Sequence, residues 1–170
     1  FTLLVLSGVT ILFYISGRNV LKSAAISELL ATAIEKQTAV ESWVNEGQSH
    51  IEAIASMENV EQNLQNYQSA LVSGSAGEAK TASNNILSEL HSSTIYNHNF
   101  QTWNILDPLS GRILISTKSG NEGKYRDDQP YFAQGLVGTY VQNMYYSLTD
   151  QAILLTIASP VRSADGEVLG

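Results

Sequence analysis

The sequence FQTWNILDPLSGRILIST, residues 100–117, contains the pattern that decides the fold. Two runs rich in β-branched, aromatic and leucine residues flank a turn that contains Asp107, Pro108 and Gly111. Asp and Pro favour the opening of a tight turn, and Gly can take the positive φ that its last position requires. The pattern therefore predicts a β-hairpin whose strands, 100–106 and 112–117, pair antiparallel.

A second pair of strands is predicted further along the chain. Residues 140–148 and 152–161 have strand composition, and Thr149, Asp150 and Gln151 form the turn between them. After another turn at 163–166, residues 167–170 are expected to begin a further strand.

A short helix is predicted between the two strand pairs. Asp128 can cap free backbone N–H groups, and Pro130 is tolerated in a first helical turn. We expect this helix to end near Gly135 or Gly138.

The part before the hairpin is predicted to be helical. In residues 26–54 a seam advances by alternating steps of four and three, which is a heptad pattern. Its positions are Ile26, Leu30, Ala33, Gln37, Val40, Val44, Gly47, Ile51 and Ile54. Glutamates occupy the opposite face. The seam can pack on its own domain or pair with a second protomer as a dimer stalk, and both can hold on different lengths of the helix.

The helical spacing continues through residues 56–67 and is broken by the small residues at 73–77, and a second helix is predicted at 78–92. Helices followed by an antiparallel sheet, with a short helix between the strand pairs, form an α+β arrangement of the PAS type.

Residues 1–17 are apolar and contain no charged side chain. A full crossing takes about 20 apolar residues, so we interpret this run as the outer part of a signal-anchor helix. A cleaved signal peptide is the alternative, but no small-residue cleavage site follows the run. The predicted organisation is a membrane anchor at 1–17, an amphipathic stalk at 18–55, a helical segment at 56–98 and a PAS-like sheet at 99–170.

The charge and the cysteine content exclude several functions. The net charge is −7, and all charged residues follow Gly17, with the basic ones isolated along the chain. Nucleic acid binding needs clustered Lys and Arg. No cysteine is present, and the three histidines, including His98, have no metal-ligand spacing. No phosphate loop or nucleophile motif occurs, so we predict no metal, no cofactor and no enzymatic activity in this segment.

In this order and spacing, the hairpin of 104–115, Pro130-Tyr131-Phe132 with Gly138, the run 155–161 and Asp165-Gly166 resemble the Cache family. The resemblance is to the membrane-distal module of double Cache sensor domains. It implies the periplasmic or extracellular input domain of a membrane receptor, with a histidine kinase, chemoreceptor or diguanylate cyclase as output. A second module, a second membrane helix and the output domain would lie outside these residues.

The resemblance also implies a pocket for a small polar ligand between the sheet and the short helix. Aromatic rings can cover the aliphatic or cationic part of such a ligand, and Arg and Asp can pair with its charges. The candidate ligand-binding residues are Trp103, Tyr125, Arg126, Asp128, Gln129, Tyr131, Phe132, Tyr145, Ser147 and Asp150. Core packing is the alternative role of Trp103 and Phe132, and a solvated pair or helix cap is that of Arg126 and Asp128.

The chain departs from the amino-acid-binding subset of the family. That subset has an Arg where this chain has Gln129 and an Asp where it has Ser147. Gln129 cannot form a charged bidentate pair with a carboxylate, and Ser147 cannot neutralise an ammonium group. An α-amino acid is therefore not the expected ligand. Two other functions stay open: a dimerisation or partner-binding module without a small ligand, and the anchor region of a membrane-bound enzyme.

Overall fold

The computed structural model describes the backbone of residues 2–96, 100–148 and 150–170, and their side chains except those of residues 2–13, 15 and 94–96. The side chains of the predicted membrane anchor lie almost wholly outside this description, as do His98 and Thr149. Among the described residues, no helix has both the length and the apolar character that a membrane crossing requires.

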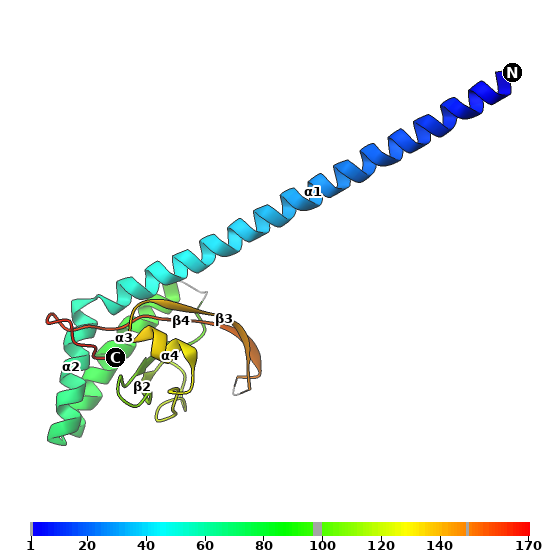
Figure 1. Cartoon of the computed structure of the whole chain (residues 1–170). Coiled ribbons are helices and arrows are strands. Elements are labelled where there is room, and N and C mark those ends of the chain that lie inside the picture. The colour runs from blue at the N-terminus through cyan, green and yellow to red at the C-terminus, as the bar shows by residue number, and fades with distance from the viewer. Residues whose placement is uncertain (1, 97–99, 149) are drawn as a thin grey trace. The chain divides into compact units, whose positions relative to one another are not determined.

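The described residues form an α+β fold with one long helix and two small antiparallel sheets (Figure 1). The elements are α1 (Thr2–Ala55), α2 (Glu58–Ser73), α3 (Ala76–Tyr96), β1 (Asn104–Leu106), β2 (Ile113–Ser116), α4 (Pro130–Gly135), β3 (Tyr140–Ser147) and β4 (Ala152–Ala158). The chain divides into two compact units, Phe1–Asn45 and Glu46–Gly170. The α+β class predicted from the sequence is confirmed.

The three long helices are separated by two tight turns. The chain leaves the helical path at Ser56 and Met57, a break that helical spacing alone did not predict. Ile54 and Val60, on either side of the break, are both buried in the same core. In a continuous helix these two residues, six positions apart, would point to different sides. The predicted break after Ser73 is confirmed, because Gly74 ends α2 with a left-handed φ of 73°.

The predicted hairpin is confirmed, with strands shorter than expected. β1 and β2 pair antiparallel, with Ile105 opposite Ile115. Gly111 has a φ of 67° and donates its N–H to the carbonyl of Asp107 at 2.9 Å. An added Cβ at Gly111 would lie 2.7 Å from the backbone nitrogen of Asp127, so only glycine fits this turn.

The second strand pair is also confirmed. β3 and β4 pair antiparallel, with Tyr145 opposite Leu154 and an irregularity between Gln142 and Tyr145. Residues 161–170 fold back on themselves in a tight loop held by backbone hydrogen bonds. One of them joins the N–H of Val161 to the carbonyl of Gly170 at 2.8 Å. The predicted strand at 167–170 is there reduced to an isolated bridge at Val168.

The core of the second unit lies between the end of α1, helices α2 and α3, and the β1–β2 hairpin. Its buried members include Leu64, Ile86, Ile115 and Val161, which come from four separate segments of the chain. Burial of such side chains is the main stabilising contribution to a domain of this size.

The seam of α1 is divided between two environments. Ile51 packs against the core, and Gly47 and Ile54 are buried within the second unit. In contrast, Ile26 and Leu30 are 48% and 58% exposed, as expected for positions that their own domain does not cover. The reading that the seam packs on its own domain therefore holds for its second part.

Candidate functional site

Four of the ten predicted residues come together beside the β3–β4 hairpin. Tyr131 extends from α4 and Tyr145 from β3, and Arg126 and Asp128 lie in the loop before α4. Burial raises the pKa of Tyr131 to about 12, Tyr145 and Asp128 act in the same direction, and the nearby Arg126 guanidinium acts against them. We call these four residues the tyrosine cluster.

The two tyrosines are held by polar contacts with the hairpin. The Tyr145 hydroxyl lies 2.9 Å from the Thr156 hydroxyl on β4. The backbone N–H of Tyr131 donates to Gln142 Oε1 on β3 at 3.2 Å. The irregularity in β3 between Gln142 and Tyr145 lets both side chains reach this region, although three positions separate them in a strand that normally alternates its faces.

The contact of Gln142 corrects the predicted helix cap. Residue Gln129, not Asp128, precedes the first turn of α4, and no side chain of its own caps that helix. Pro130 occupies the first turn as predicted. A free N–H of the first turn is instead satisfied by a side chain from the sheet, which fixes α4 to β3 and places Tyr131.

Ser147 and Asp150 form a second polar group at the end of the hairpin. The Asp150 carboxylate accepts a hydrogen bond from Ser147 at 2.9 Å and pairs with the Lys118 ammonium at 2.5 Å. The hydrogen bond from Lys118 is the main cause that lowers the pKa of Asp150, the bond from Ser147 adds to it, and Arg126 contributes more weakly. This carboxylate is already neutralised by Lys118 and is a poor partner for a cationic ligand.

The remaining predicted residues lie outside the tyrosine cluster or have backbone roles. Trp103 is buried in the core, with its ring 4.6 Å from Phe100, so the core-packing role is the one observed. Tyr125 is 57% exposed beside the bridge to Arg112. Gln129 precedes α4, and Phe132 is half-buried within it.

Three polar residues near the predicted site were missed by the sequence reasoning. Gln142 and Thr156 follow no motif, and their role arises from the register of β3 against β4. Lys118 lies 32 positions from its partner Asp150. A signal for Thr156 was available, because a hydroxyl in an otherwise aliphatic strand is uncommon and often has a polar partner.

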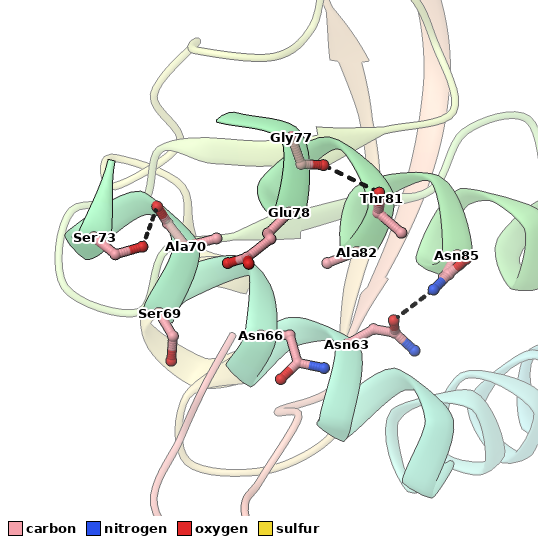
Figure 2. A pocket seen from close by; sticks show the side chains of 10 residues that line it. All are labelled: Asn63, Asn66, Ser69, Ala70, Ser73, Gly77, Glu78, Thr81, Ala82 and Asn85. Carbon is pink, nitrogen blue, oxygen red and sulfur yellow. Dashed lines mark hydrogen bonds between the residues drawn. The ribbon is translucent and has the colours of Figure 1, made fainter. Parts of the chain in front are cut away.

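A hollow of about 530 Å³ lies elsewhere in the second unit, between α2 and α3 (Figure 2). Small and polar side chains from both helices line it, and none of the ten predicted residues does. Asn85 of α3 donates a hydrogen bond to Asn63 Oδ1 of α2 at 2.9 Å, and both residues line the hollow. Ser73 and Thr81 donate to carbonyls of their own helices, so their hydroxyls serve helix geometry first.

The tyrosine cluster offers polar groups that can form hydrogen bonds. At neutral pH a phenol with a pKa of about 12 stays protonated, so Tyr131 can donate a hydrogen bond. Comparisons with protein-family models, with curated proteins and with solved structures gave no match.

Proposed function

We propose that this chain is the extracytoplasmic sensing input of a transmembrane signalling receptor, and that the tyrosine cluster binds its small polar ligand. The observation that carries the proposal is the convergence of two phenols, a guanidinium and a carboxylate between α4 and the β3–β4 hairpin. Phenol and guanidinium groups bind anionic or hydrogen-bonding ligands, and aromatic faces cover apolar parts.

The cluster contains one cationic group, Arg126, and one carboxylate, Asp128, so Arg126 is its anchor for a ligand that carries an anionic group. Asp150 is neutralised by Lys118 and hydrogen-bonded by Ser147, whereas Arg126 is half-exposed beside the Tyr131 phenol. A carboxylate or phosphate group can take two hydrogen bonds from a guanidinium and another from a protonated phenol. An organic acid is therefore a better candidate than an amine or an α-amino acid.

The test is a thermal-shift screen of the protein against organic acids, amino acids, amines and purines. A ligand of the folded state raises the midpoint with concentration by mass action. Tyr131→Ala and Tyr145→Ala should abolish the rise, whereas Tyr146→Ala is the matched control because that side chain is 59% exposed on the next position of β3. If Tyr146→Ala also abolished the rise, or if no compound of the panel raised the midpoint, the result would count against the proposal.

A second proposed role, dimerisation, follows from the first unit. Large apolar side chains of α1 such as Leu29, Ile34 and Val40 are 70%, 61% and 56% exposed, which is unusual for a helix without a partner. We propose that a second copy of the chain covers this face as a parallel coiled coil. The role is compatible with sensing and is also the alternative to it, in which the module binds a partner and has no ligand of its own.

Sedimentation of the protein in a mild detergent tests this second role. Leu30→Glu and Val40→Glu place charges on the exposed part of the seam and should convert a dimer into a monomer. Glu35→Gln, on the opposite face, is the control. A monomer in the unchanged protein would refute the dimer.

The membrane location belongs to the same proposal. The apolar run at 1–17 supports an anchor in the cell membrane, and the resemblance to Cache modules supports an outside location for residues 18–170. Fusion of a reporter enzyme after Gly170 in a bacterial host, active only outside the cytoplasm, tests this orientation.

A further inference from the structure

The strand β4 is packed between two helices through two neighbouring residues. An added Cβ at Gly135 of α4 would lie 2.8 Å from the Cβ of Ala158, and an added Cβ at Gly47 of α1 would lie 2.9 Å from Cδ1 of Ile157. Successive side chains of a strand point to opposite faces. α4 therefore packs on one face of β4 and the Gly47 turn of α1 on the other.

The face toward α4 also carries the tyrosine cluster. Thr156 has the same orientation as Ala158, and its hydroxyl holds the Tyr145 phenol at 2.9 Å. The residue between them, Ile157, contacts α1 on the other face. A displacement of β4 at Thr156 consequently reaches α1 through the very next residue.

Two buried polar groups on the α1 side of β4 have no hydrogen-bond partner among the described residues. One turn after Gly47, the His50 ring lies 5.8 Å from the Phe100 ring and 5.9 Å from the Trp103 ring. Nε2 of His50 and Nε1 of Trp103 are buried and have no hydrogen-bond partner among the described residues. An unpaired buried donor and acceptor are costly, and the indole N–H is a suitable donor to a neutral imidazole nitrogen.

We infer that the Gly47–His50 turn of α1 and the Ile157 and Trp103 side chains form a contact with two alternative positions. This contact couples the tyrosine cluster to α1. In the second position α1 is displaced relative to β4, so that the Trp103 N–H donates a hydrogen bond to His50 Nε2. Glycine at position 47 leaves the helix free to move against the end of the Ile157 side chain. The inference rests on the proposed sensing function and gives it a route, because α1 continues unbroken from this contact to Thr2.

The coupling is measured with double-variant cycles of urea unfolding on the full chain, in the absence of any ligand. One cycle combines Tyr145→Phe, which removes the bond to Thr156, with Gly47→Ala, and a second combines Tyr145→Phe with Ile157→Val. Gly47→Ala should still fold, since the added methyl meets only the free end of Ile157 and of the Phe100 ring. Independent changes multiply the unfolding constant within about twofold.

We expect each of the two cycles to depart from that product by about fivefold or more. The control cycle combines Tyr145→Phe with Gly77→Ala, where an added methyl meets nothing within 4 Å, and should agree with the product. A departure in either test cycle with agreement in the control supports the inference. Agreement in both test cycles, or an equal departure in the control, overturns it. Because no ligand is used, this outcome is independent of the thermal-shift screen that tests the proposed function.

Discussion

The packing of α4 on β4 predicts that Gly135→Ala destabilises the protein. The new methyl carbon would lie 2.8 Å from the Cβ of Ala158, well inside the 3.5 to 4.0 Å at which carbon atoms attract. Both atoms are fixed to the backbone, so relief requires α4 to move away from the strand. Overpacking of this kind costs about 1 to 3 kcal/mol, and the helical preference of Ala over Gly returns at most about 1 kcal/mol. We expect a net loss of about 1 to 2 kcal/mol.

The assay is urea unfolding followed by Trp103 fluorescence in a Trp43→Phe background. With a urea dependence of about 1 to 3 kcal/mol per molar, the midpoint should fall by roughly 0.5 to 1 M. Gly77→Ala is the control, because its added methyl meets open space and should leave the midpoint unchanged or slightly raised. A Gly135→Ala protein as stable as the Gly77→Ala protein would refute the packing argument.

Three further predictions concern ionisation and the core. The hydrogen bond from Lys118 lowers the pKa of Asp150, so its stabilisation is present above about pH 4 and is lost as the pH falls through the folded pKa. Asp150→Asn should therefore cost up to about 1 kcal/mol in urea unfolding at pH 7, and this cost should shrink as the pH falls below about 4. A cost that does not change with pH would contradict this. Burial raises the pKa of Tyr131 to about 12, so Tyr131→Phe should reduce the tyrosinate absorbance change that appears above pH 11, to which Tyr67, whose pKa burial also raises, contributes as well. The stability that the neutral Tyr131 phenol contributes should be lost as the pH rises from about 10 to 12. Ile86→Ala should lower the free energy of unfolding by about 2 to 5 kcal/mol, because Ile86 is 1% exposed. Leu71→Ala, at a 54% exposed site of α2, should lower it by less than about 1 kcal/mol. Similar losses for the two variants would mean that the core is misplaced.

The sequence by itself determined the features that depend on neighbouring residues. The turn at Asp107 to Gly111, the stop after Ser73 and the start of α4 at Pro130 follow from backbone preferences of Gly, Pro and Asp, and all three are present. Strand-like composition between turn residues likewise identified both strand pairs, and the heptad pattern identified the long helix. These signals are local, since each involves residues only a few positions apart.

For several side chains the sequence allowed more than one position, such as the core or the surface. Only the tertiary structure decided between these positions. Trp103 is in the core because Phe100 and His50, the latter 53 positions earlier, pack around it. Gln142 caps α4 because of where β3 lies, and the exposed and buried parts of the α1 seam meet near Gly47 because β4, more than 100 positions later, packs there. Burial of a residue depends on segments far away in the chain, and the pattern around that residue contains no information about them.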